Sequence, residues 1–272
     1  MNKLKTSQPA GILNADYFKN NFSLSTFYPK EQLKDYIEHY WLISWKLPEG
    51  ISHTQDVIPH PNTHLTFLKN HSHIQGICKQ KYTHTLEDEG NIVGVKFKPA
   101  GFFPFAEKAG LALSTICDNT FDINKIFNVP SIAKAEQHIL TLDEPTEKID
   151  YLDQLLFSFP IKADNNINKL NEIVASIEAN QEIMKVSDIC KIFNMEPRYL
   201  QRLFVKYIGV SAKWVINRYR MHDALTNVES NKEIDWASLA IQLGYYDQAH
   251  FIKDFKGMIG KTPKDYHSSI DG

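Results

Sequence analysis

The last third of the chain contains the sequence SDICKIFNMEPRYLQRLFVKYIGVS at residues 187–211 and a similar stretch, ASLAIQLGYYDQAHFIKDFKGMIGKT, at residues 237–262. The two stretches lie about fifty residues apart, and Phe204 of the first copy corresponds to Phe255 of the second. Self-similarity at a fixed period is the signature of a repeated structural unit. Each copy is predicted to fold as a helix, a tight turn and a second helix.

The turn inside each copy predicts where its two helices end and begin. Asn194 in the first copy and Gly244 in the second suit a turn that needs a positive φ angle. Asp247 is the expected N-cap of the helix that follows the second turn. The first helices of the two copies are therefore expected at residues 186–193 and 236–243.

The second helix of each copy has an apolar side and a polar side when its residues are placed 100° apart. The apolar side is expected to form core, and it comprises Leu200, Leu203, Phe204 and Tyr207 in the first copy and Phe251, Phe255 and Met258 in the second. The opposite side is expected to face solvent, and it comprises Arg198, Gln201, Arg202, Val205 and Lys206 in the first copy and Ala249, Ile252, Lys253 and Lys256 in the second.

The outward side chains suit recognition of double-stranded DNA. A helix of about 10 to 12 Å diameter fits the major groove, where arginine can pair with guanine and glutamine with adenine. Basic residues on one helical face are usually only solvated surface. Two such units about 34 Å apart, however, would meet successive turns of the major groove on one side of the duplex. The duplication therefore favours DNA binding, although the net charge of -2 does not by itself indicate it.

Residues 165–267 closely resemble the DNA-binding domain of AraC/XylS-type transcription regulators, most clearly in IQLGYYDQAHFIKDFKGMIGKTPKDYH at 241–267. The resemblance implies seven helices, with a long helix from Ala212 to about Asn227 that connects two subdomains rigidly. It also implies base contacts from Arg198, Gln201 and Arg202 in the first copy, and from Gln248, Ala249, His250 and Lys253 in the second. Lys206 and Lys256 on the same outward faces complete the predicted DNA-binding set.

The second copy departs from the family at two of these positions. Many relatives have arginine where this chain has Lys253 and serine where it has Ala249. Lysine offers a point charge rather than a planar fork of donors. We therefore expect Lys253 to contact phosphate rather than a pair of base atoms.

The first hundred residues have a different pattern. Apolar and polar positions alternate over residues 36–100 in short runs that predict strands, of which the clearest are HYWLISWKL at 39–47, THLTFL at 63–68 and NIVGVKFK at 91–98. After Pro99, helical spacing returns at residues 102–110, 131–140 and 147–159. A short polar segment follows Pro160, so the domain boundary is placed there. The expected fold is α+β with two domains, residues 1–160 and residues 161–272.

The N-terminal half resembles the sensor-like domain of one branch of AraC-type regulators. The resemblance rests on EHYWLISWKLPEG at 38–50, VIPHPNTHLTF at 57–67 and VGVKFKPAGFFPF at 93–105. It implies a cupin-like β-barrel with helical additions, which in the family usually binds a small ligand or pairs subunits. A group of aromatic residues can either form the core of this domain or line an apolar pocket: Tyr40, Trp41, Trp45, Phe67, Phe97, Phe102, Phe103 and Phe105.

No catalytic, metal or cofactor site is predicted. Four clustered histidines, with His53 nearby, lack an acidic residue at an evident partner position, so we expect surface or hydrogen-bonded histidines rather than metal ligands: His60, His64, His71 and His73. Cys78, Cys117 and Cys190 are widely scattered and form no CxxC pair, which argues against a disulfide framework or a zinc site. The chain has neither a GxxxxGK[ST] loop nor an HExxH motif, so an NTPase or zinc-peptidase reading has no support.

These patterns together predict a transcription regulator rather than an enzyme. The expected partner is double-stranded promoter DNA, and a small-molecule effector, RNA polymerase and a second copy of the chain are further candidates. No run reaches the roughly 18 apolar residues of a membrane span and the N-terminus lacks a signal-peptide core, so we expect a cytoplasmic protein without membrane contact. The alternative is a small-molecule-binding or catalytic N-terminal domain joined to a helical protein-interaction module.

Overall fold

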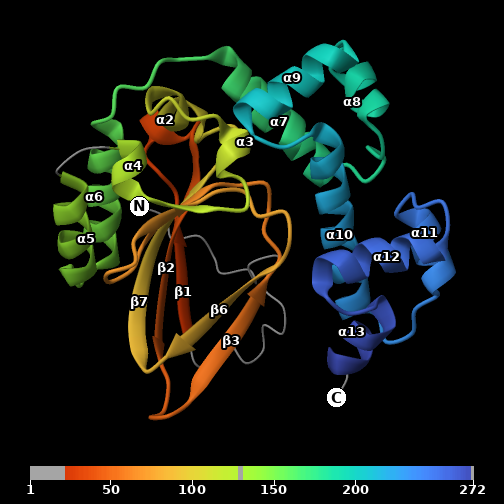
Figure 1. Ribbon diagram of the computed structural model, residues 1–272, viewed down its shortest axis with the longest axis horizontal. Helices are drawn as coiled ribbons and strands as arrows, with labels where there is room; N and C mark the ends of the chain where they lie inside the picture. Colours follow the sequence, from red (N-terminus) through yellow and green to blue (C-terminus); the bar gives the residue numbers. More distant parts are fainter. Residues whose placement is uncertain (1–21, 128–130, 271–272) are drawn as a thin grey trace.

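The computed structural model describes residues 22–127 and 131–270. A β-rich half and a helical half lie side by side, as Figure 1 shows. None of the helices in these two ranges has the length and apolar character needed to cross a membrane.

The β-rich half is built on a six-stranded antiparallel sheet. Its strands lie in the order β1 (Phe22–Phe27), β2 (Ile37–Lys46), β7 (Glu89–Phe97), β4 (His64–Phe67), β5 (His73–Gln75) and β8 (Thr120–Asp122). A separate two-stranded ribbon is formed by β3 (Ser52–Val57) and β6 (Tyr82–Glu87). The strands predicted at 39–47, 63–68 and 91–98 are confirmed as β2, β4 and β7. The other five strands were not predicted individually.

Cross-strand packing explains why one face of this sheet accepts two tryptophans. In the register of β2 and β7, Trp41 lies opposite Gly94 and Trp45 opposite Gly90. A Cβ atom on Gly94 would come within 2.0 Å of the Trp41 ring, so the tryptophan can lie flat only because this residue is glycine. Tyr40 points to the opposite face, because successive side chains of a strand alternate, and there it is fully buried.

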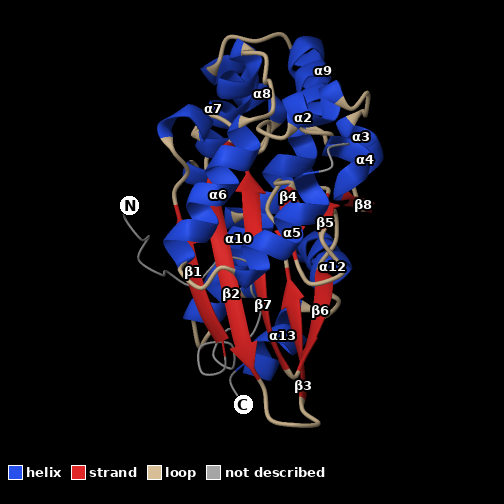
Figure 2. Ribbon diagram, turned by 90° about the vertical axis from the view of Figure 1, so that its left-hand side faces the viewer, coloured by secondary structure: helices blue, strands red, loops and turns tan. Residues whose placement is uncertain are grey.

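A layer of helices covers the face that buries Tyr40 (Figure 2). It consists of the 3-10 helix η1 (Glu31–Leu33) and of α2 (Phe103–Lys108), α3 (Leu113–Ile116), α4 (Ile123–Phe127), α5 (Ser131–Thr141) and α6 (Pro145–Phe157). The helices predicted at 102–110, 131–140 and 147–159 correspond to α2, α5 and α6. Phe97 of β7 packs edge-on against Phe102 and Phe105, with ring centroids 4.9 and 5.4 Å away. The aromatic residues near Pro99 therefore join the sheet to its helical layer.

The C-terminal part of the described chain contains the seven helices that the resemblance implied. They are α7 (Asn165–Ala179), α8 (Val186–Ile192), α9 (Pro197–Tyr207), α10 (Ala212–Ser230), α11 (Trp236–Gln242), α12 (Gln248–Ile259) and α13 (Pro263–Ile270). The long helix α10 continues to Ser230, three residues beyond the predicted end at about Asn227. We call α8 with α9 the first unit, and α11 with α12 the second unit.

The two units belong to different hydrophobic cores. One continuous core contains the sheet, its helical layer, α7, the first unit and the beginning of α10. A second core contains the end of α10, the second unit and α13, together with Ile58 from the β-rich half. The first unit is therefore packed into the β-rich half, whereas the second unit has a core largely of its own.

Candidate nucleic-acid interface

The first unit is shaped by caps and by one left-handed residue. The Asp188 carboxylate accepts hydrogen bonds from the backbone N–H groups of Met184 (3.1 Å) and Lys185 (2.8 Å), which lie just before α8. Asn194 ends the helix with a φ of 47°, as expected for the turn. Pro197 then starts α9 at a position where the missing N–H is no loss.

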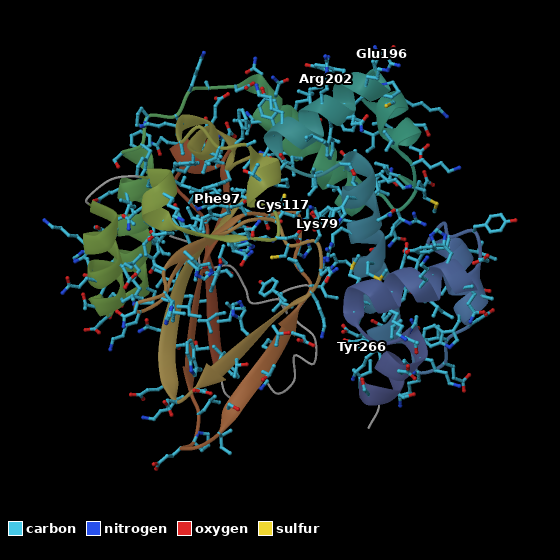
Figure 3. The ribbon with its side chains drawn as sticks, in the orientation of Figure 1. Lys79, Phe97, Cys117, Glu196, Arg202 and Tyr266 are labelled. Atoms are coloured by element: carbon cyan, nitrogen blue, oxygen red, sulfur yellow. The ribbon has the colours of Figure 1, made fainter. Side chains whose placement is uncertain are left out.

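Helix α9 separates its two faces as predicted. Four apolar side chains are buried: Leu200, Leu203, Phe204 and Tyr207. The outward residues are all exposed: Arg198, Gln201, Arg202, Val205 and Lys206. Figure 3 shows Arg202 and Glu196 at the outer edge of the first unit, away from the β-rich half. The predicted base-reading side chains of this unit thus lie where a duplex can reach them.

The second unit repeats this construction with different caps. Asp235 caps α11 by accepting from the N–H groups of Ala237 and Ser238. Gly244 makes the turn with a φ of 70°. The predicted N-cap is confirmed, because the Asp247 carboxylate accepts from the His250 N–H at 2.8 Å at the start of α12.

The outward face of α12 is exposed at every predicted contact position, namely Gln248, Ala249, His250, Lys253 and Lys256. The prediction for Ile252 is wrong. This side chain is half-buried and packs against the second core, because α12 is covered more widely than an idealised helical face allows. Met258, expected inside, is also only half-buried.

Few of the predicted contact residues have charged partners within the protein. His250 Nε2 lies 3.7 Å from Asp254 Oδ2 one turn along α12. Lys206 Nζ lies 4.0 Å from Glu107 Oε1 and 5.2 Å from the centre of the Phe103 ring, both in the β-rich half. In the described ranges, no carboxylate oxygen lies within 4.0 Å of the other basic members of the set: Arg198, Arg202, Lys253 and Lys256.

A buried arginine connects α10 to the β-rich half, and it was not predicted. Arg218 is fully buried, and its Nη2 donates to the backbone carbonyls of Cys78 (3.3 Å) and Lys79 (2.6 Å). Its guanidinium lies 4.7 Å from the centre of the Trp214 ring. Burial lowers the pKa of Arg218 to about 10. An arginine on an amphipathic helix normally indicates a solvated face, so the sequence carried no signal for this contact.

The aromatic group singled out in the N-terminal half divides into two sets. Six members are buried in the core between the sheet and its helices: Tyr40, Phe67, Phe97, Phe102, Phe103 and Phe105. Trp41 and Trp45 are half-buried on the opposite face of the sheet, and the Trp41 indole N–H has no hydrogen-bond partner in the described part of the chain. Only these two tryptophans are therefore placed where a ligand bound beside the sheet would meet them.

The surroundings of the histidines and cysteines in this half favour neither a metal site nor a reactive thiol. Glu178 lies 4.0 Å from His60, an acidic partner that the sequence did not indicate, and the His60 ring stacks on His222 at 4.2 Å. Burial lowers the pKa of His64 to about 3. Residues 22–127 and 131–270 contain no cluster of histidine, cysteine and carboxylate side chains suited to a metal ion. Burial raises the pKa of the Cys78 thiol to about 11, which disfavours a reactive thiolate.

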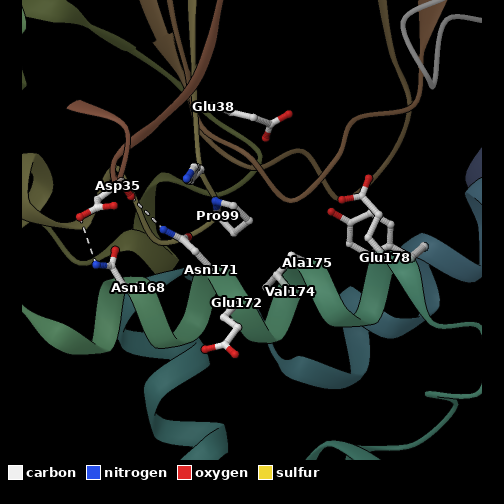
Figure 4. A pocket seen from close by; sticks show the side chains of 11 residues that line it. Asp35, Glu38, Pro99, Asn168, Asn171, Glu172, Val174, Ala175 and Glu178 are labelled. Atoms are coloured by element: carbon white, nitrogen blue, oxygen red, sulfur yellow. Dashed lines mark hydrogen bonds between the residues drawn. The ribbon is translucent and has the colours of Figure 1, made fainter. Parts of the chain in front are cut away.

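A cavity of about 530 Å³ lies where the β-rich half meets α7. Figure 4 shows its floor on α7, where Asn168 donates to the Asp35 carboxylate at 3.1 Å and Asn171 to the Asp35 carbonyl at 3.0 Å. Three further carboxylates line it, from Glu38, Glu172 and Glu178. Burial raises the pKa of Glu178, and the nearby charge of Glu38 raises it further. None of the predicted aromatic or DNA-binding residues lines this cavity.

Comparison with known families agrees with the geometry of the two units. The family described as "Helix-turn-helix domain" matches residues 189–269, which include the end of α8, all of α9 and the whole second unit. These residues form an AraC-type helix-turn-helix domain. The resemblance predicted for the last third of the chain is thereby confirmed. Residues 25–120 match a second family, described as a domain of unknown function (DUF6597), which is consistent with a sensor-like domain ahead of the AraC-type domain.

Two curated relatives are similar to part of the chain. The Msm operon regulatory protein of Streptococcus mutans is 29% identical over 104 residues, which are 38% of this chain and 36% of that protein. The regulatory protein PocR of Salmonella typhimurium is 29% identical over 107 residues, which are 38% of this chain and 34% of that protein. The chain thus spans about a third of the length of these relatives.

Among solved structures, ToxT from Vibrio cholerae is 12% identical to this chain, with a TM-score of 0.37. The likeness covers 93% of this chain and 99% of ToxT.

Proposed function

We propose that this chain is a sequence-specific DNA-binding transcription regulator of the AraC type. The observation that carries the proposal is the pair of helix-turn-helix units in one domain, each with a second helix whose predicted contact residues are exposed. The names of the curated relatives, both described as regulatory proteins, support the same function.

In the proposed complex, α9 and α12 enter successive major grooves. Arg198, Gln201 and Arg202 read base edges, because arginine and glutamine present the donors and acceptors that guanine and adenine match. Lys253 contacts phosphate, and Lys206 and Lys256 contribute charge from the same faces. Phosphate contacts set the register of the protein on DNA, and base contacts set its sequence preference. One chain then binds an asymmetric site.

The two halves have different proposed roles. Residues 161–272 bind promoter DNA, and residues 1–160, a cupin-like domain, bind a small effector or pair two copies of the chain. Trp41 and Trp45 support an effector on the face of the sheet opposite Tyr40, since both are half-buried there. The regulator acts in the cytoplasm, contacts RNA polymerase, and has no enzymatic activity, cofactor or membrane association of its own.

The test is binding-site selection from random duplexes with the full chain at physiological salt. The full chain is used because the first unit shares its core with the β-rich half. We expect one enriched sequence with two half-sites and an affinity that falls steeply with added salt. Failure to prefer any duplex would instead favour a protein-interaction role for the helical half, attached to a ligand-binding or catalytic N-terminal domain.

A further inference from the structure

The two units meet at one point on the linker helix α10. The beginning of α10 contributes Val215, Ile216 and Tyr219 to the first core, whereas its end contributes Met221 and residues beyond it to the second core. Arg220 lies between these two sets. A helix of 19 residues is about 28 Å long, so α10 sets the distance between the units. It does not by itself set their rotation about the helix axis.

Arg220 holds the turn of the second unit from the side of α10. Its Nε donates to the backbone carbonyl of Leu243, the C-cap residue of α11. The last carbonyls of a helix have no partner within the helix, so this bond satisfies one of them. The Arg220 guanidinium also lies 4.6 Å from the centre of the Tyr245 ring, within cation–π distance.

Tyr245 connects Arg220 to α12. Its side chain is almost fully buried, and its ring lies 5.4 Å from Phe251 and 5.3 Å from His250. Phe251 belongs to the buried face of α12, and His250 belongs to its exposed, predicted DNA-contacting face. A change in the Arg220 contact would therefore change the direction in which α12 presents its outward residues.

Met184 lies just before the first unit, where its backbone N–H donates to the Asp188 carboxylate of α8, and its side chain reaches the same turn. A Cβ atom on Gly244 would lie 2.6 Å from Met184 Sδ and 3.1 Å from Arg220 Nη2. Gly244 also has a φ of 70°, a left-handed conformation that favours glycine. Met184, Arg220 and Gly244 thus bring the first unit, the linker helix and the second unit together at one joint.

From this joint we infer that Arg220 is a positioning residue that fixes the rotation of the second unit relative to the first, and thereby sets the spacing between the two DNA half-sites. The inference rests on the proposed DNA-binding function. Adding one base pair moves a half-site by about 3.4 Å and rotates it by about 35°, so a rigid protein tolerates few spacings. A protein with a loose joint tolerates several.

The first measurement needs no DNA. Spin labels are placed at Lys191→Cys in α8 and Lys264→Cys in α13, two exposed positions, in a Cys190→Ser background. Cys78 and Cys117 stay unlabelled because both are buried. We expect one narrow distance distribution for the parent chain by pulsed electron resonance, and a distribution about twice as wide for Arg220→Met, since the guanidinium contacts to Leu243 and Tyr245 are lost.

The second measurement uses the selected DNA site with the half-site spacing changed by one to five base pairs. The parent chain should lose about tenfold or more in affinity at wrong spacings, because only one half-site is then engaged. Arg220→Met should bind the best-spaced site less tightly than the parent chain does, and its affinities for the different spacings should differ by about threefold or less. Its affinity for an isolated half-site should stay unchanged. A purely stabilising role would weaken binding equally at every spacing.

Lys213→Met is the matched control, because Lys213 is an exposed residue of the same helix. It should leave both measurements unchanged. Met184→Ala removes a different contact of the same joint and should broaden both the distance distribution and the range of tolerated spacings. This variant keeps the inference testable if Arg220→Met unfolds. A distance distribution that stays narrow, or a spacing preference that stays sharp in a folded Arg220→Met protein, overturns the inference. A parent chain that selects no duplex refutes the proposed function instead, and the distance distribution then decides on Arg220 alone.

Discussion

Replacing Gly209 by alanine should loosen the contact between the first unit and the β-rich half. Gly209 follows α9 with a φ of +95°, and an L-residue held in such a conformation costs about 1–3 kcal/mol. A Cβ atom there would also lie 2.8 Å from the carbonyl carbon and oxygen of Leu113 in α3. These atoms are backbone, so they can move only if α3 moves with them.

Two other glycines separate the cost of strain from the cost of overlap. Gly110 has a φ of +72° but open space around the position of a Cβ atom, so Gly110→Ala should cost only strain, about 1–2 kcal/mol. Gly257 is exposed in the last turn of α12 with open space, so Gly257→Ala should stabilise by about 0.5–1 kcal/mol. Gly209→Ala combines strain with overpacking, and we expect a loss of about 2–4 kcal/mol.

The free energy of unfolding of the three variants is compared by chemical denaturation and by thermal unfolding of the full chain. In a chain of this size, 1 kcal/mol shifts the melting temperature by about 2–4 °C, so a loss of about 2–4 kcal/mol in Gly209→Ala should lower it by roughly 4–16 °C. A Gly209→Ala loss no greater than that of Gly110→Ala would refute the reasoning. It would mean that α3 can move away from the α9–α10 turn at little cost in free energy.

Three further predictions concern DNA binding and pH. Arg202→Ala should cost about 1–3 kcal/mol in binding and relax the preference at one base position, and equal weakening on all sequences would contradict this. Lys253→Ala should weaken binding to every sequence and lower the salt slope by about one, whereas a loss confined to one base pair would contradict a phosphate contact. Burial lowers the pKa of His222 to about 4, below its ordinary 6.5, so the unfolded chain takes up this proton first and stability falls as the pH drops from about 6.5 to 4. His222→Gln should make that fall shallower in denaturation curves measured across this range, and an unchanged slope would contradict the assignment.

The two units could be predicted from the sequence because their signals are local. Asn194 and Gly244 are needed at turns with positive φ, and both have it. The alternation of apolar and polar positions along α9 places its buried face correctly, because a regular helix converts spacing directly into direction. The long strands β2 and β7 could be predicted for the same reason, because a strand places alternate residues on opposite faces.

Features that depend on long-range packing could not be predicted. No local signal shows that the first unit shares a core with the sheet, because Tyr207 and Phe103, whose rings lie 4.2 Å apart, are about a hundred residues apart in sequence. The buried state of Arg218 depends on the Cys78 and Lys79 carbonyls, which come from the other half. Ile252 was misplaced because the covered width of α12 is set by its neighbours and not by its own sequence.

The shared core also decides what the contact between Lys206 and Glu107 can do. This pair joins a predicted DNA-contacting residue to the β-rich half, which could make the β-rich half a competitor of DNA. However, its atoms are 4.0 Å apart and both side chains are more than half exposed, and such pairs contribute only about 0–1 kcal/mol. A DNA phosphate can therefore displace Glu107 at little cost. The attachment of the first unit to the β-rich half must depend instead on buried contacts such as Phe103 with Tyr207, which DNA does not reach. An effector that alters DNA binding through the first unit consequently has to act by shifting that apolar packing.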